Sequence, residues 1–223
     1  DKLIALGHRR LSIIDTRVEA NQPMKSNSKR WDVVFNGEIY NFKEIKEKLN
    51  YSFKTNSDTE VSLAAVEENG IDWFIEEANG MFAIALYDNV SKDLFLIRDR
   101  LGIKPIYYFF DGTKIIFSSE IKGILASGLV SAEFNESAVD EYLANRYVRA
   151  PYTFFNKIFQ VEPGTYLKIK SSAEFRIIKY WELPFDFNIQ TEYNEDEILL
   201  KFEKELTNST GALKVATETS GIA

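Results

Sequence analysis

The sequence predicts an α+β domain in which helices pack outside antiparallel sheets, and three observations support this fold class. Two helical patterns occur early, at residues 41–49 and 57–70. From residue 81 a run of segments rich in β-branched and aromatic residues predicts consecutive strands. The turns between these segments are short, which favours antiparallel pairing. Early helices followed by a run of strands are typical of layered α+β domains.

Composition limits the classes of function. The 223 residues are 45% hydrophobic and 14% aromatic, which supports a buried core. The net charge of −7 and the lack of a basic stripe argue against nucleic-acid binding. No apolar run approaches the length of a membrane span and the first residues do not read as a signal peptide. We therefore expect a soluble, cytoplasmic protein that binds neither membranes nor nucleic acid.

Cysteine and histidine usage restricts the chemistry further. The chain contains no cysteine, which excludes disulfides and thiolate metal sites among these residues. Its single histidine, His8, makes a multi-histidine metal site impossible and a serine–histidine triad improbable. No metal site is expected.

The first elements lead to the dipeptide Asn36-Gly37. Residues 3–6 and 11–14 form two apolar segments, and residues 1–6 are interpreted as a strand. Residues 31–35 predict a buried strand. Asn36-Gly37 then breaks the apolar run, and a type I′ hairpin is one interpretation. Asn41, with a glutamate three residues later, favours instead a helix N-terminus, so that the strand leaves the sheet at Asn36-Gly37. At such an exit a side-chain amide and a glycine N–H would suit an oxyanion hole.

The remaining elements follow from hydrophobic periodicity and from residues that typically start or end helices and strands. Residues 51–55 alternate as a short strand, Ser57 and Glu60 fit a capping box, and Gly70 is a plausible helix end. An amphipathic helix around residues 198–206 cannot bury its apolar face alone, and the tail from residue 207 shows no clear periodicity. Further strands are expected at 81–87, 94–98, 106–110, 114–118, 165–169 and 175–181, and further helices at 120–126 and 135–147.

Charged residues at three sharp breaks would suit a free α-amino acid. Arginine is the best partner for an α-carboxylate, and Arg10 lies at the first break. An ammonium group needs anions, which Glu38 and Asp58 supply. Each residue also has a plainer interpretation. Arg10 and Glu38 would be solvent-facing charges, and Asp58 would only stabilise a helix N-terminus.

Six motifs connect the chain to a known family. In order they are GHRRLSIID, NGEIYN, NSDTE, NGMFAIALYD, LIRDRLGIKPIYY and FSSEIK. Together they resemble the glutaminase domain of glutamine-hydrolysing asparagine synthetases, which are class II glutamine amidotransferases with the N-terminal-nucleophile hydrolase fold. The resemblance implies a four-layer αββα sandwich over residues 1–183. It also implies a linker at residues 184–194 and, in residues 195–223, the start of an α/β, ATP-dependent synthetase domain.

The resemblance also implies roles for residues. Arg10 would bind the glutamine α-carboxylate with help from the backbone that follows it. Glu38 and Asp58 would hold the α-amino group, and Asn36 and Gly37 would form the oxyanion hole. The turn at residues 98–105 matches the family but receives no role, and Ser118-Ser119-Glu120 is interpreted as structural. The implied site residues are Arg10, Leu11, Ser12, Ile13, Ile14, Asn36, Gly37, Glu38 and Asp58.

Two features depart from the family. Its members begin with a cysteine whose thiolate attacks the glutamine amide, with the α-amine of the same residue as base. This chain has no cysteine and starts after the corresponding position, so we expect a missing N-terminal segment rather than a degenerate member. At the other end, residues 219–223 are at most a stub of the family's pyrophosphate loop.

The expected function is therefore that of an asparagine synthetase. Glutamine hydrolysis would release ammonia, and a further domain using ATP and Mg²⁺ would amidate aspartate. A homodimer is compatible with the resemblance. One alternative is a related amidotransferase with another carboxylate acceptor, such as a polysaccharide sugar acid or a β-lactam precursor. Another is a catalytically dead glutamine-sensing module.

We predict that the chain of residues 1–223 releases no ammonia from glutamine, because the cysteine nucleophile is not among its residues. Enzymatic ammonia detection with purified chain tests this. Ammonia release above the buffer control would show that another side chain attacks the amide.

Overall fold

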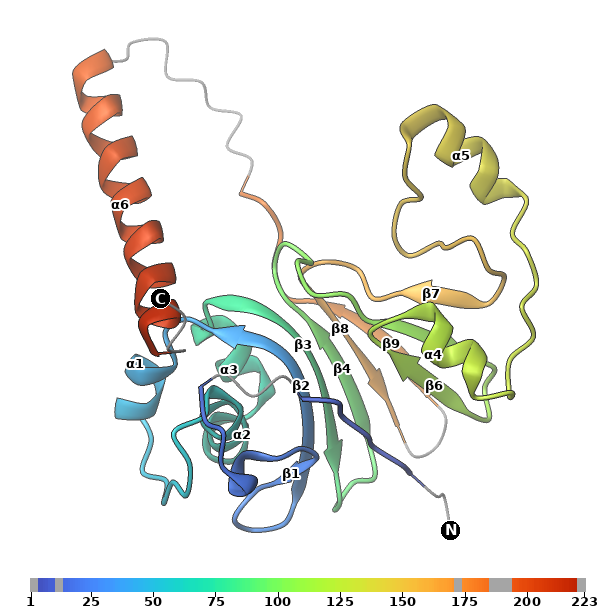
Figure 1. Ribbon diagram of the computed structural model, residues 1–223, viewed down its shortest axis with the longest axis horizontal. Helices are drawn as coiled ribbons and strands as arrows, with labels where there is room; N and C mark the ends of the chain where they lie inside the picture. Colours follow the sequence, from blue (N-terminus) through green and yellow to red (C-terminus); the bar gives the residue numbers. More distant parts are fainter. Residues whose placement is uncertain (1–3, 11–13, 171–173, 185–193, 220–223) are drawn as a thin grey trace.

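The computed structural model describes residues 4–10, 14–170, 174–184 and 194–219 (Figure 1). Its strands are β1 (Met24–Lys25), β2 (Trp31–Ile39), β3 (Gly80–Asp88), β4 (Leu94–Arg98), β5 (Tyr107–Phe110), β6 (Ile115–Ser118), β7 (Ile158–Gln160), β8 (Thr165–Ile169) and β9 (Phe175–Lys179). Its α-helices are α1 (Phe42–Glu47), α2 (Asp58–Asn69), α3 (Ile71–Glu77), α4 (Ile121–Ala126), α5 (Ser137–Asn145) and α6 (Glu195–Thr219), and a short 3₁₀ helix spans Val18–Ala20.

The larger sheet is six-stranded, in the order β1-β2-β3-β4-β8-β9, and every neighbouring pair is antiparallel. Its two longest strands, β2 and β3, pair along their whole length, with Phe35 opposite Ile84. Side chains alternate between the faces of a strand, so Phe35 and Val34 enter different cores. Both faces of β2 are therefore buried, which explains its continuous apolar run.

The smaller sheet has the order β6-β5-β7 and packs against one face of the larger sheet. The core between the two sheets combines Val34 and Leu96 from the larger sheet with Ile106 and Tyr108 at the start of the smaller one. Two antiparallel sheets thus share one apolar layer.

Helices cover the outer faces of both sheets (Figure 1). Ile45 of α1, Leu63 of α2 and Phe74 of α3 belong to one buried cluster with the outward-facing side chains of β2 and β3. On the other side, Ile124 of α4 packs with Phe109 of β5. The layers run helix, sheet, sheet, helix, which confirms the expected four-layer αββα sandwich.

The turn after β4 is fixed by a buried arginine. Arg98 is 6% exposed, and its guanidinium donates to the carbonyls of Gly102 (2.6 Å), Val161 (2.6 Å) and Lys104 (3.0 Å). The neighbouring carboxylate of Asp99 accepts backbone N–H groups from the same turn. This charged motif is therefore an interior scaffold, and it sets the position of Lys104 at the rim of the cavity described below.

The prediction that Asn36-Gly37 ends a strand is wrong, and so is the hairpin interpretation. β2 continues to Ile39, with Asn36 opposite Ala83 and Gly37 opposite Phe82. Pairing with β3 extends along the whole strand, and this long-range ladder overrides the local turn signal of the dipeptide.

Two further strand predictions are wrong. Residues 51–55 form no strand because the Glu60 carboxylate accepts the N–H groups of Lys54 (3.0 Å) and Thr55 (2.6 Å), taking the place of a neighbouring strand. Residues 4–6 also form no strand, and Leu6 packs against the core between the sheets. The other residues of those two apolar segments, apart from Ile14, lie outside the described residues.

Helix ends were predicted with mixed success. Ser57 precedes α2 and its Oγ accepts the Glu60 N–H (3.2 Å), which confirms the cap, and α2 ends before Gly70 as expected. Asn41 precedes α1 but does not cap it. Its side chain instead donates to the Glu77 carbonyl (2.9 Å) and accepts from the Asn79 N–H (2.9 Å), tying α1 to the entry of β3.

The sequence patterns missed α3, β1 and β7, and they cut α6 short. α6 runs to Thr219, and its apolar residues Ile198, Phe202 and Leu206 are exposed, as expected for a face that cannot be buried alone. None of the described helices is both long enough and apolar enough to cross a membrane. The predicted linker falls largely on residues 185–193, outside the described residues, and the division into domains stays a prediction.

We predict that Arg98→Met lowers the free energy of unfolding by at least ~3 kcal/mol, because three carbonyls near a buried guanidinium lose their donor. Urea denaturation followed by circular dichroism measures it. Arg100→Met is the matched control, since the Arg100 guanidinium makes one exposed hydrogen bond, to the Glu76 carbonyl, and its loss should cost under ~1 kcal/mol. Equal losses for both variants would contradict the interior role of Arg98.

Candidate functional site

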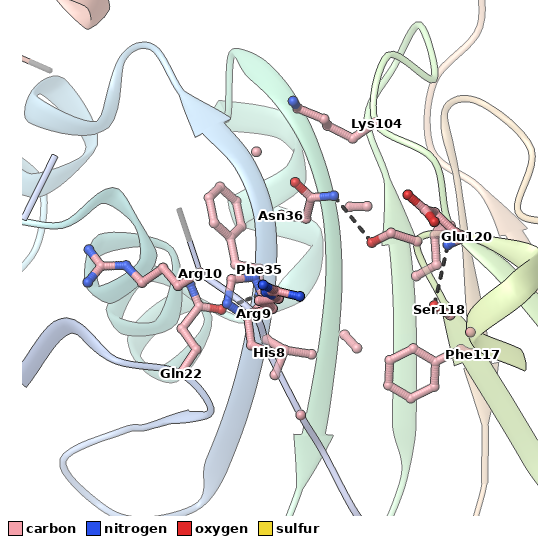
Figure 2. A pocket seen from close by; sticks show the side chains of 18 of the residues that line it. His8, Arg9, Arg10, Gln22, Phe35, Asn36, Lys104, Phe117, Ser118 and Glu120 are labelled. Carbon is pink, nitrogen blue, oxygen red and sulfur yellow. Dashed lines mark hydrogen bonds between the residues drawn. The ribbon is translucent and has the colours of Figure 1, made fainter. Parts of the chain in front are cut away.

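The predicted residues gather around one cavity of about 980 Å³. It lies where residues 7–10, β2, the start of α2 and the turn between β6 and α4 meet (Figure 2). Leu11, Ser12 and Ile13, which the resemblance implies for backbone contacts, lie outside the described residues. The predicted residues that line the cavity are Arg10, Ile14, Asn36, Gly37, Glu38 and Asp58.

The edge of β2 away from β3 carries backbone N–H groups into this region. In an antiparallel ladder alternate residues direct these groups to opposite edges. The Phe35 N–H donates to the Gln22 side-chain oxygen (2.6 Å), and the Ile39 N–H donates to Asp58 Oδ2 (3.1 Å). Gly37 lies between them with the same parity, and among the described residues no side chain accepts its N–H. This N–H is thus the donor available to a ligand.

Both the backbone conformation and the small space at position 37 require glycine. Its φ is +148°, which side chains rarely adopt, and a Cβ there would lie 2.0 Å from the Met81 carbonyl oxygen. At this point of the cavity wall β3 approaches so closely that there is room for backbone atoms but not for a side chain.

Asn36 adds a second neutral donor. Its side chain leaves β2 toward the space between the sheets, and its Nδ2 donates to the Ser119 hydroxyl (3.2 Å; Figure 2). An amide nitrogen carries two N–H groups, so one remains for a ligand. Asn36 and Gly37 are therefore two uncharged donors on consecutive residues.

Carboxylates form an anionic part of the wall. Asp58 is 5% exposed, and its oxygens accept the N–H groups of Ile39 (3.1 Å) and Thr59 (2.8 Å). Burial raises the pKa of Asp58 to about 6, and the nearby Glu38 charge adds to the effect. Burial also raises the pKa of Glu38, while Lys104 opposes that shift. A ligand cation beside Asp58 and Glu38 would relieve both penalties.

Arg10 supplies the cationic part. One guanidinium nitrogen, Nη2, donates to the Asp15 carbonyl, while Nη1 is buried without a hydrogen-bond partner in the described part of the chain. A buried charged donor without an acceptor is costly, and a ligand carboxylate would satisfy it. Figure 2 shows the Arg10 guanidinium and the Asn36 amide pointing in opposite directions from β2. They would therefore contact different ends of an elongated ligand.

Three residues of the site were missed by the sequence reasoning. Gln22 joins β2 to α2, because its Oε1 accepts from Phe35 and its Nε2 donates to Thr59 Oγ1 (3.3 Å). Ser119, interpreted as structural, contacts Asn36. His8 lines the cavity, and burial beside Arg10 lowers its pKa, so it is neutral at pH 7. His8 lies in the GHRRLSIID motif and Ser119 in the FSSEIK motif, but neither motif indicated a role for these two residues, and Gln22 lies in none of the six motifs.

The fold resembles that of a solved structure. The sandwich matches a glutamine phosphoribosylpyrophosphate amidotransferase from B. subtilis with a TM-score of 0.57 and 20% sequence identity. The match covers 78% of this chain and 34% of that one. This likeness shows that the chain shares the layered α+β fold of that protein.

Residues 1–181 match the family model of a glutamine amidotransferase domain, and the chain belongs to that family. Asparagine synthetase [glutamine-hydrolyzing] 2 of Bacillus subtilis is 37% identical over 203 residues, which is 88% of this chain and 27% of that protein. Amidase chry2 of Gibberella zeae is 34% identical over 198 residues, 87% of this chain and 29% of that protein. The chain therefore spans less than a third of either relative, and the family resemblance seen in the sequence is confirmed.

Proposed function

We propose that this chain is the glutaminase part of a glutamine-hydrolysing asparagine synthetase. The observation that carries the proposal is a single cavity lined by two neutral donors, Asn36 and Gly37, and by Arg10, whose Nη1 has no partner among the described residues and whose guanidinium points away from the Asn36 amide. Glutamine needs this separation, because its α-carboxylate and its reacting amide lie at opposite ends of the molecule.

The ends of glutamine would be held by charge. The α-carboxylate would accept from Arg10 Nη1, and the ammonium would lie against the carboxylates of Asp58 and Glu38. Charge-assisted contacts of this kind are about twice as strong as neutral hydrogen bonds. They would orient the side-chain amide toward β2.

The reaction would then depend on Asn36 and Gly37. Attack on the amide carbon converts its oxygen to an oxyanion, and ammonia leaves when the carbon–nitrogen bond breaks. Two fixed neutral donors stabilise the developing negative charge more than they stabilise the ground-state carbonyl. The nucleophile implied by the resemblance, an N-terminal cysteine, is not among the 223 residues.

For the whole protein we propose transfer of the ammonia to a further domain that amidates aspartate with ATP and Mg²⁺, in a cytoplasmic protein that forms a homodimer. By the family resemblance, the ATP and Mg²⁺ site would belong to that further domain. The likeness to amidase chry2 favours a second candidate, in which the same glutaminase serves another carboxylate acceptor.

We predict that two substitutions in the natural full-length protein affect different kinetic constants. Arg10→Ala should raise the glutamine KM by ~10-fold to 100-fold, because a desolvated carboxylate loses a charge-assisted partner. Asn36→Ala should lower the glutaminase kcat by ~100-fold with little change in KM, because its donor acts on the oxyanion. Steady-state ammonia release against glutamine concentration measures both constants.

Arg149→Ala is the control for these variants, since Arg149 pairs with Glu141 of α5 away from the cavity, and it should leave both constants unchanged. Unchanged KM in Arg10→Ala would remove Arg10 from the glutamine site. A lost affinity with intact kcat in Asn36→Ala would indicate that Asn36 binds the ground state.

Glutamine affinity should depend on pH through Asp58. The pKa of Asp58 is about 6, above its ordinary value, so the carboxylate becomes neutral as the pH falls below 6. An ammonium ligand favours the ionised form, and the affinity of the chain for glutamine should therefore be full near pH 7.5 and fall by up to ~10-fold per pH unit below 6. Calorimetric titration measures it without turnover, because this chain has no cysteine.

Asp58→Asn should bind weakly with a flatter pH profile, whereas Arg10→Ala should bind weakly but keep the wild-type profile shape. The carboxylate of Glu38 also titrates in this cavity, and Glu38→Gln separates its contribution to the pH dependence of glutamine affinity. Equal dissociation constants for the unmodified chain at pH 5 and pH 7.5 would remove Asp58 from the ammonium site.

A further inference from the structure

The side chain of Asn36 has one hydrogen-bond partner among the described residues, the Ser119 hydroxyl (3.2 Å). Ser119 lies in the turn that joins β6 of the smaller sheet to α4. Asn36 belongs to the larger sheet. This contact therefore crosses the space between the two sheets at the cavity wall, where Figure 2 marks it at the Asn36 amide.

A side-chain amide acts as an oxyanion donor only in one orientation. Rotation by half a turn about its terminal torsion exchanges the nitrogen and the oxygen, and that torsion has broad, nearly two-fold preferences. An amide oxygen directed at an oxyanion would repel it. Asn36 thus needs an external contact that selects the productive orientation, and the other side of β2 offers none, since Gln22 and Asp58 bind backbone N–H groups there.

From this geometry we infer that Ser119 is a positioning residue that orients the Asn36 amide for glutamine hydrolysis, an inference that rests on the proposed function. As acceptor, the Ser119 hydroxyl holds one N–H of Nδ2 and leaves the second N–H for the oxyanion. Ser119 itself need not contact glutamine. Its removal leaves the donor present but free to rotate.

The adjacent serine gives a matched comparison. The Ser118 hydroxyl accepts the Glu120 N–H (3.3 Å) and lies beside Gly123, so its contacts are with α4 and not with Asn36. Ser118→Ala removes a hydroxyl from the neighbouring residue, at the end of β6, without removing the contact across the sheets. Ser119→Thr keeps a hydroxyl acceptor at the position of interest.

In the natural full-length protein Ser119→Ala should lower the glutaminase kcat by ~5-fold to 10-fold, the effect of one neutral hydrogen bond, with the glutamine KM within about twofold of the wild-type value. Ser119→Thr should restore kcat to within about twofold of wild type, and Ser118→Ala should leave it within the same range. In the Asn36→Ala background Ser119→Ala should have no further effect, because nothing is left to orient.

Full additivity of Ser119→Ala with Asn36→Ala would overturn the inference, since Ser119 would then act independently. An unchanged kcat in Ser119→Ala, in a wild-type protein that hydrolyses glutamine, overturns the inference and leaves the proposed function intact. A wild-type protein without glutaminase activity overturns both.

A second measurement does not depend on activity. In ¹⁵N-labelled chain of residues 1–223, hydrogen exchange of the Asn36 side-chain amide should accelerate in Ser119→Ala but not in Ser118→Ala, with near-UV circular dichroism confirming that both variants are folded. Equal exchange in all three proteins would overturn the proposed contact.

Discussion

The site depends on how the outer edge of one strand is used. β2 pairs with β3 along its whole length, so every second N–H group of β2 points to its other edge. The short strand β1 pairs with this edge only at Asp32 and Val33, and the later N–H groups are left to other acceptors. Side chains from two other segments take two of these groups, Gln22 at Phe35 and Asp58 at Ile39. The same two contacts fix the start of α2 against the strand. The positions of the Gly37 N–H and of the buried Asp58 carboxylate therefore both follow from how the backbone N–H groups along this edge of β2 find acceptors.

The two sheets make different contributions to this site. The larger sheet supplies the donors on β2, and the smaller sheet, with α4, supplies the opposite wall through Ser119. The turn after β4 connects them, because Arg98 binds the carbonyl of Val161 near the smaller sheet while Asp99 accepts the N–H of Phe82 on β3. Charged residues that look like surface features in the sequence therefore hold the layers in place.

The sequence predicted what is local and strongly patterned. The strands at residues 94–98 and 165–169 match the structure to the residue, and Ser57 caps α2 as its spacing indicates. It failed where distant groups decide the outcome. Asn36-Gly37 has the composition of a turn, but pairing with β3 extends the strand through it, and Asn41 is bound by Glu77 and Asn79 from the entry to β3.

The site shows the same division. Arg10, Asn36, Glu38 and Asp58 could be chosen by chemistry and by resemblance, and they surround one cavity. Gln22 and Ser119 could not, because the importance of a glutamine or serine lies in the group it meets across the fold.

The close packing at Gly37 has a practical consequence for redesign. A library that randomises the cavity wall would recover only glycine at position 37 on steric grounds, since the Met81 carbonyl oxygen leaves no room for a methyl group. Invariance there would measure the spacing of two strands and would say nothing by itself about chemistry.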